Sequence, residues 1–186
     1  MIQFFLDVDG VVFDFDSDFL KIINRAFNKN LPPDFCPNDW YWTSHPVDIS
    51  IEQSLHAYSL FKEERGFRFL KPYPESIKFI ENIKQQGHHI DFVTNIPADH
   101  RDDRIFCFKQ HNIMYDRVFT VETKSQCINN IKLPDATRYI FIDDNQENCE
   151  DVLQNCPGIE VYIVSKPYNL SYTKAARLDQ LAALKY

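Results

Sequence analysis

Two acidic pairs that follow apolar segments are the residues of this sequence best suited to chemistry. Asp7 and Asp9 follow the apolar run Phe-Phe-Leu, and Asp143 and Asp144 follow the apolar run Tyr-Ile-Phe-Ile. Like charges this close together are costly unless a cation lies between them. Carboxylate oxygens are also the ligands that Mg²⁺ prefers in proteins. The two pairs therefore indicate a metal site at the ends of two strands.

Two further polar positions lie between these pairs. A predicted strand ends at Thr94, and Lys124 lies near a predicted helix start. Each feature also has a purely structural explanation. An Asp-x-Asp-Gly sequence can form a turn, Thr94 and the second acidic pair can cap helices, and most lysines are solvated. Their joint occurrence in the order Asp-x-Asp, Thr, Lys, Asp-Asp favours one shared site.

This order of motifs resembles the haloacid dehalogenase superfamily. Within it, the segment 7–15 resembles the first motif of the 5′(3′)-deoxyribonucleotidases, which are cytosolic 5′-nucleotidases of type C. The segment 66–74 resembles the return of that family from its cap to its core. The Pro-Tyr-Asn sequence within 163–169 is similar to a segment near the end of bacterial relatives. Residues 94–97 resemble the Thr-Ser-Pro phosphate loop, with Asn95 in place of serine and Ile96 as an additional residue.

The resemblance implies a phosphomonoester hydrolase that works through an aspartyl-phosphate intermediate on nucleoside monophosphates. In that reading Asp7 is the nucleophile and Asp9 the acid and base. Lys124 offsets the negative charge of nucleophile and phosphate. Thr94 and Asn95 would hold phosphate oxygens together with Lys124. The resemblance also implies Mg²⁺ as the cofactor, with four expected ligands: Asp7, Asp9, Asp143 and Asp144.

Aromatic residues outside these motifs are candidates for substrate contacts. Phe15 directly follows the first motif, while Trp40 and Phe67 lie in the segment between the first and second predicted strands. The π face of an aromatic ring can stack on a base. Packing inside the protein explains the same residues equally well, residue by residue.

The elements that must position these residues alternate along the chain. Apolar periodicity and turn residues predict strands at 2–7, 88–93, 116–120, 138–142 and 159–164, and helices at 17–28, 50–64, 74–86, 98–111, 124–131, 145–154 and 171–184. Alternating strands and helices predict an α/β fold with a three-layer, doubly wound parallel sheet. Residues 14–70 do not follow this alternation. We expect them to form a small, mostly helical cap on a core of residues 1–13 and 71–186.

Composition limits the classes of function. The 186 residues include 44% hydrophobic residues, enough for a packed core, and the net charge of −7 argues against binding to a nucleic-acid polymer. The five cysteines form no Cys-x-x-Cys pair, which indicates reduced thiols. No signal peptide and no apolar run of membrane-spanning length is recognisable. We therefore expect a cytoplasmic protein with a small phosphorylated substrate.

Several features are assigned simpler roles, and other functions stay open. Asp14, Asp16 and Asp18 are interpreted as helix-start charges, and the mixed run 99–104 as a solvated helix face. The same catalytic residues would serve a phosphatase for another small metabolite. A phosphorylatable switch domain and a catalytically silent relative are the alternatives outside enzymology.

Overall fold

The centre of the protein is a six-stranded parallel sheet. The computed structural model describes residues 1–186, and its strands are β1 (Ile2–Leu6), β2 (His89–Thr94), β3 (Arg117–Thr120), β4 (Arg138–Asp143), β5 (Ile159–Val164) and β6 (Ala176–Leu178). Their order in the sheet is β3-β2-β1-β4-β5-β6, and every neighbouring pair is parallel. Strands β1 and β4 are neighbours in the sheet, although 131 residues lie between the end of β1 at Leu6 and the start of β4 at Arg138.

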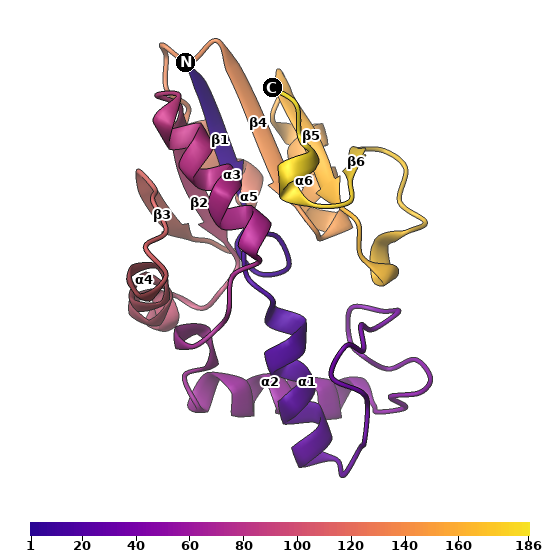
Figure 1. Ribbon diagram of the computed structural model, residues 1–186. Helices are drawn as coiled ribbons and strands as arrows, with labels where there is room; N and C mark the ends of the chain where they lie inside the picture. Colours follow the sequence, from indigo (N-terminus) through magenta and orange to yellow (C-terminus); the bar gives the residue numbers. More distant parts are fainter.

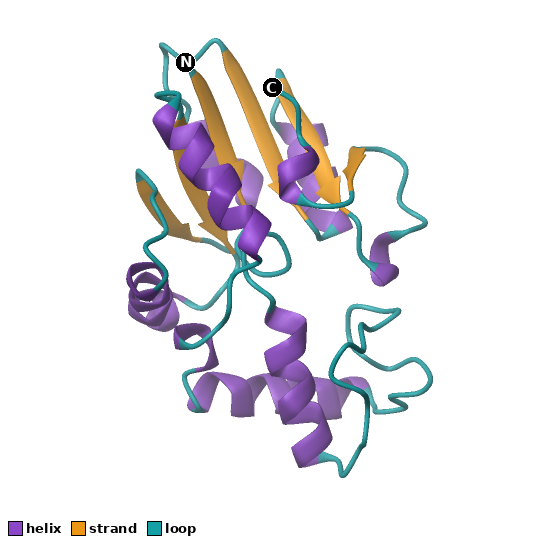
Figure 2. Cartoon of the chain, in the orientation of Figure 1, coloured by secondary structure: helices purple, strands orange, loops and turns teal.

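Helices cover both faces of this sheet (Figures 1 and 2). The helices are α1 (Phe15–Ala26), α2 (Ile51–Glu63), α3 (Pro74–Gln85), α4 (Arg101–Gln110), α5 (Lys124–Ile131) and α6 (Gln146–Asn155), with short 3₁₀ turns at Gly66–Arg68, Ala98–His100, Pro167–Asn169 and Leu181–Ala183. Alternate residues of β1 belong to two different cores. Phe4 packs in the larger core with α3 and α4, while Phe5 packs in the smaller core with α5 and α6. The predicted three-layer α/β fold is confirmed. No helix is long and apolar enough to cross a membrane.

Local sequence signals explain where several helices begin. Ser50 accepts a hydrogen bond from the backbone of Gln53, whose side chain bonds back to the backbone of Ser50, so a complete capping box starts α2. Pro74 lies in the first turn of α3, where its missing N–H is not needed. Asp14 caps α1 through the backbone N–H of Ser17.

The strand order reverses between β1 and β4. Strands β2 and β3 follow β1 to one side of the sheet, and β4, β5 and β6 extend to the other. In open parallel sheets, ligands bind beyond the carboxyl ends of the strands at such a switch point. The two acidic pairs lie at the carboxyl ends of the two strands that flank it, so this topology brings together residues far apart in the sequence.

The segment between β1 and α3 lies beyond the carboxyl ends of the strands (Figure 1). It contains α1 and α2, which pack on each other, and a stretch of turns at 27–50. Its entry and exit run side by side, because the Asp14 N–H donates to the Lys71 carbonyl and the Tyr73 N–H donates to the Val12 carbonyl, both at 2.9 Å.

The predicted final helix at 171–184 is wrong. Residues 176–178 instead form β6, the edge strand beside β5, and only 181–183 make a 3₁₀ turn. The three-residue spacing of Leu178, Leu181 and Leu184 is typical of one face of a helix. All three are buried in the larger core, although the segment that carries them is not helical. Arg177 stabilises the extended path by donating to the carbonyls of Asn169, Leu170 and Tyr172.

Candidate active site

A tight loop after β1 sets the backbone of the site. The Val12 and Phe13 N–H groups both donate to the Val8 carbonyl, so the chain turns back at once after the strand. Gly10 lies in this turn with a φ of +73°, and a Cβ atom there would lie 2.1 Å from an Asp144 carboxylate oxygen. Glycine is therefore required both for the backbone conformation and for the approach of Asp144.

Lys124 joins the two acidic strand ends. Its Nζ donates to Asp7 Oδ1 and to Asp143 Oδ2, each at 2.6 Å, and its side chain is fully buried. Burial alone would lower the pKa of Lys124, but the Asp143 and Asp7 carboxylates raise it above its ordinary value. The lysine is thus a fixed positive charge at the base of the site. Burial in turn raises the pKa of Asp143 to about 6 despite that lysine.

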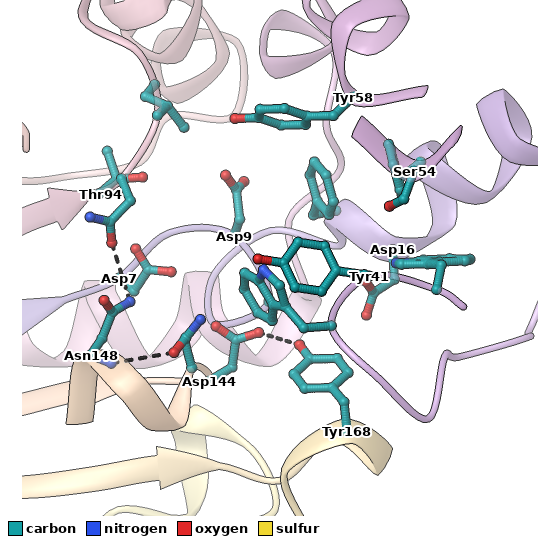
Figure 3. Close-up of a pocket in the computed structure, with 18 of the residues that line it drawn as sticks. Asp7, Asp9, Asp16, Tyr41, Ser54, Tyr58, Thr94, Asp144, Asn148 and Tyr168 are labelled. Atoms are coloured by element: carbon teal, nitrogen blue, oxygen red, sulfur yellow. Dashed lines mark hydrogen bonds between the residues drawn. The ribbon is translucent and has the colours of Figure 1, made fainter. Parts of the chain in front are cut away.

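Asp144 completes a group of three buried carboxylates. One oxygen each from Asp7, Asp143 and Asp144 lie within 4.8 Å of one another. Asp144 makes no ion pair, and its hydroxyl partner is Tyr168, whose O–H donates to Oδ2 (Figure 3). Burial and the neighbouring Asp143 raise the pKa of Asp144 well above its ordinary value. One lysine among three carboxylates leaves an excess of negative charge, and this donor set fits a hard divalent cation.

Asp9 lies outside this carboxylate group. Its two oxygens each accept from Nη2 of Arg104 at 2.6 Å. Arg104 comes from α4, is fully buried, and its guanidinium lies over the rings of Phe13 and Phe67 at 5.6 and 5.2 Å. Burial raises the pKa of Asp9 above its ordinary value even beside this arginine. The carboxyl group of Asp9 is therefore paired with Arg104, whereas that of Asp7 is paired with Lys124.

The expected solvated helix face at 99–104 is confirmed for Asp99, Arg101 and Asp102, which are exposed, and is wrong for its last two residues. Arg104 and Asp103 are buried, at 0% and 4% exposure, and Asp103 binds Arg65 and Arg68. Arg104 shares the buried side of α4 with Cys107 and Phe108. Its spacing of three and four residues from these apolar residues is the sequence signal that could have identified it.

The residues at the end of β2 face the same site. Thr94 is 1% exposed and lines the pocket beside Asp7. Asn95 also lines it, although its side chain already donates to the carbonyls of Val121 and Glu122 and accepts from Asn148. The Asn95 amide therefore holds neighbouring backbone in place at the pocket wall, in the position where the resemblance expects a serine hydroxyl.

Beyond these strand ends lies a pocket of about 370 Å³. Most of its aromatic residues come from the segment between β1 and α3, including the three expected substrate residues Phe15, Trp40 and Phe67. Phe67 is almost fully buried and packs edge-on against Phe61 at 5.1 Å between ring centroids. Trp40 is 52% exposed, and its ring meets the ring of Tyr168 at 5.6 Å. The pocket thus has a carboxylate-rich end and an aromatic end (Figure 3).

Tyr168 and Asp16 are among the pocket residues that were not predicted as site residues. Tyr168 reaches Asp144 because Asn169, next to it in the chain, donates to the backbone carbonyls of Asp144 and Val164. The Pro-Tyr-Asn sequence was the available signal for it. Asp16 lies in the first turn of α1, as the interpretation as a helix-start charge expects, and it also lines the pocket.

Comparisons with known proteins agree with this geometry. The family described as 5′ nucleotidase, deoxy (Pyrimidine), cytosolic type C protein matches residues 1–185. A Bacillus cereus protein named "Putative nucleotidase" is 23% identical over 184 residues, which cover 96% of this chain and 88% of that protein.

Solved structures share the fold at low sequence identity. A Burkholderia xenovorans protein named "putative haloacid dehalogenase-like hydrolase" superposes with a TM-score of 0.65 at 12% identity, over 97% of this chain and 93% of that one. The hydrolase YfnB from Bacillus subtilis, described as bound to magnesium, gives a TM-score of 0.60 at 15% identity, over 96% and 94%. Because the family match spans the whole sheet and its site, the chain belongs to the cytosolic type C 5′-nucleotidase family, and it shares its fold with haloacid dehalogenase-like hydrolases.

Proposed function

We propose that this protein is a Mg²⁺-dependent phosphatase that dephosphorylates nucleoside monophosphates through a phosphoryl group carried on Asp7. The observation that carries the proposal is the contact of Lys124 with both Asp7 and Asp143 at the open end of the sheet. A lysine that orients a carboxylate also neutralises charge where an anionic substrate must approach. Membership of a nucleotidase family supports a small phosphorylated substrate.

In the proposed reaction Asp7 attacks phosphorus and the ester oxygen leaves. Asp9 protonates that oxygen and later takes a proton from the water that hydrolyses the phosphoryl group. The raised pKa of Asp9 supports a role as proton donor, and Arg104 would fix the direction of its carboxyl group. Thr94 and Asn95 would contact phosphate oxygens from the pocket wall.

The proposed ligands of Mg²⁺ are Asp7, Asp143 and Asp144, whose carboxylates lie together. Asp9 was also expected as a ligand. Its carboxylate accepts from Arg104, so it is not among the proposed Mg²⁺ ligands. When bound, Mg²⁺ would supply positive charge that allows an anionic phosphate to approach three carboxylates. Tyr168 would hold Asp144 in place through its hydroxyl group.

We further propose that residues 14–70 form the cap and that 1–13 and 71–186 form the catalytic core. The paired backbone bonds at Asp14–Lys71 and Val12–Tyr73 support these limits, because entry and exit of the segment lie side by side there. A pocket of about 370 Å³ with aromatic walls suits one nucleotide, within the range of about 300–1,000 Å³ common for small-molecule sites. It supports a mononucleotide substrate and not a polymer.

Cysteine chemistry supports a cytoplasmic location. All five cysteines are free thiols: Cys36, Cys107, Cys127, Cys149 and Cys156. Burial raises the pKa of Cys107 to about 12, so this thiol stays protonated at neutral pH. Unpaired cysteines are typical of reducing compartments.

Phosphate release from a substrate panel tests the proposal. The panel contains ribo- and deoxyribonucleoside 5′- and 3′-monophosphates, sugar phosphates and phenyl phosphate, each with Mg²⁺ and with a chelator. We expect Mg²⁺-dependent release that is fastest with nucleoside monophosphates. Turnover of sugar phosphates or phenyl phosphate alone would retain the chemistry and reject the nucleotide substrate. Absence of release from every compound would favour a switch domain or a silent relative.

A further inference from the structure

Asp16 is an acidic residue in the aromatic part of the pocket. It lies in the first turn of α1, directly after Phe15, and lines the pocket with Trp40 and Tyr41. In Figure 3 it lies on the opposite side of the pocket from Asp7 and Thr94. The proposed chemistry therefore does not use it, and it faces the part of a substrate that is remote from the phosphate.

The other acids of this helix start have partners within the chain. Asp14 accepts from the backbone N–H and the hydroxyl of Ser17, and Asp18 binds Lys21. Asp16 accepts only from the Sγ of Cys36, at 3.7 Å, and makes no ion pair. Lys166 influences it electrostatically, but the ammonium group of Lys166 donates to the Tyr73 hydroxyl at 2.9 Å. The carboxylate of Asp16 thus has unused acceptor capacity toward the pocket.

A poorly partnered carboxylate among aromatic rings discriminates between ligands. The carboxylate of Asp16 has no cationic partner within ion-pair distance, and burial raises its pKa to about 6. A ligand group with an N–H or O–H compensates it, whereas a ligand group without a donor leaves the carboxylate desolvated and unpaired. A second anionic group on the ligand would be repelled. A binding site with a buried acceptor that needs a hydrogen bond from the ligand discriminates against analogues that lack the donor.

We propose that Asp16 is a specificity-determining residue that selects phosphate monoesters carrying a neutral amine or hydroxyl donor at the end remote from the phosphate. This inference rests on the proposed function, because it assumes that the phosphate lies at Asp7. In a nucleoside monophosphate the donor is either the exocyclic amine of the base or a hydroxyl of the sugar. Both groups offer the same chemistry to the carboxylate.

Matched substrate pairs distinguish these two sources. The cytosine deoxynucleotide is compared with its pyrimidin-2-one analogue, which lacks only the amine. The ribo-, deoxy- and dideoxyribonucleotides of one base are compared for the sugar hydroxyls. A third pair, 3-aminophenyl phosphate and phenyl phosphate, contains no nucleoside. Each ratio of kcat/KM is measured with the wild type, Asp16→Leu and Asp16→Asn, and with the control Asp18→Leu on the same helix.

We expect the wild type to favour the donor-bearing member of at least one pair by about tenfold or more. Asp16→Leu should bring that ratio close to one, Asp16→Asn should give an intermediate ratio, and Asp18→Leu should leave it unchanged. A change confined to the cytosine pair identifies the base amine, and one confined to the sugar series identifies a hydroxyl. Ratios that are the same in wild type and both Asp16 variants for all three pairs overturn the inference.

The design separates this result from the proposed function. If the wild type hydrolyses only the aryl phosphates, nucleotidase activity is refuted while the aminophenyl and phenyl pair still tests Asp16. The melting temperature serves as a control for folding. Replacing a poorly partnered carboxylate by leucine among aromatic rings should not lower it. A merely structural role of Asp16 would lower stability and leave the ratios unchanged.

Discussion

Arg104 Nη2 lies 2.6 Å from each carboxylate oxygen of Asp9. The arginine side chain is fully buried, whereas that of Asp9 is 21% exposed on the pocket side. The Nε and Nη1 atoms of Arg104 have no hydrogen-bond partner. The only hydrogen bonds that the Arg104 side chain makes are therefore those that hold Asp9 in a fixed orientation.

Arg104→Gln should destabilise the protein and slow the reaction. It leaves Asp9 in a desolvated position without its cation, which costs about 3 kcal/mol in comparable buried pairs. We expect kcat to fall by at least tenfold with little change in KM, because the loss affects proton transfer more than phosphate binding. Urea unfolding and steady-state kinetics measure the two effects.

Arg138→Gln is the matched control for this variant. Arg138 pairs with Glu160 on the surface, where both side chains are about 40% exposed, so its loss should cost less than about 1 kcal/mol. Equal stability losses in the two variants, together with an unchanged kcat for Arg104→Gln, would contradict the role assigned to Arg104.

Gly10→Ala should be far more harmful than Gly87→Ala. Both glycines have a positive φ, of +73° and +74°, so both substitutions carry a backbone cost of about 1–2 kcal/mol. At Gly87 a Cβ meets nothing within 4 Å, but at Gly10 it would overlap the Asp144 carboxylate. Thermal unfolding and phosphate release should show loss of activity for Gly10→Ala alone. A similar activity in both variants would refute the close approach.

Mg²⁺ should stabilise the wild type and should not stabilise Asp144→Asn to the same extent. At a concentration of 100 times its Kd a ligand adds about 2.7 kcal/mol to the free energy of unfolding. Without Mg²⁺ the variant should melt at a higher temperature than the wild type, because it relieves repulsion among three buried carboxylates. Melting curves at constant ionic strength measure both effects. Equal Mg²⁺ shifts in the two proteins would exclude Asp144 as a ligand.

The preference attributed to Asp16 should depend on pH. Burial raises its pKa to about 6; Lys166 and the hydrogen bond from Cys36 oppose this shift, whereas Asp14 and Asp9 add to it. The carboxylate is charged above that pH and neutral below it, so preference for the donor-bearing substrate should rise between about pH 5 and pH 7. The ratio of two kcat/KM values cancels catalytic groups common to both substrates. A ratio independent of pH in this range would contradict the assignment.

The alternation of strands and helices predicted most of the sheet because each core element carries its own periodic signal. The predicted helix at 124–131 agrees with α5, and the apolar run before Asp143 agrees with β4. The final segment failed because an edge strand of three residues is too short to show alternation. Its path depends on contacts of Arg177 with carbonyls of the preceding loop, which no local pattern reveals.

The positions of candidate site residues were predictable where these residues lie at a strand end. Asp7, Thr94 and Asp143 could be identified in this way, and Lys124 through its position in the motif order. Arg104 was not identified from the sequence, because a run of charged residues on a helix is typical of a solvated face. Only its position on the same side of the helix as the apolar residues Cys107 and Phe108 indicates that it is buried. The pocket role of Asp16 depends on the packing of a segment with few regular elements, which a sequence pattern does not describe.

A rapid-quench experiment with the wild type and Asp7→Asn tests the central claim most directly. Substrate and Mg²⁺ are mixed with enzyme, quenched in acid within the first turnover, and the peptides are examined by mass spectrometry. We predict one phosphoryl group on the peptide that contains Asp7 in the wild type, and neither phosphopeptide nor phosphate release in Asp7→Asn, whose fold should be intact. Phosphate release by Asp7→Asn at a rate near that of the wild type, or a phosphoryl group on another residue, would contradict the mechanism.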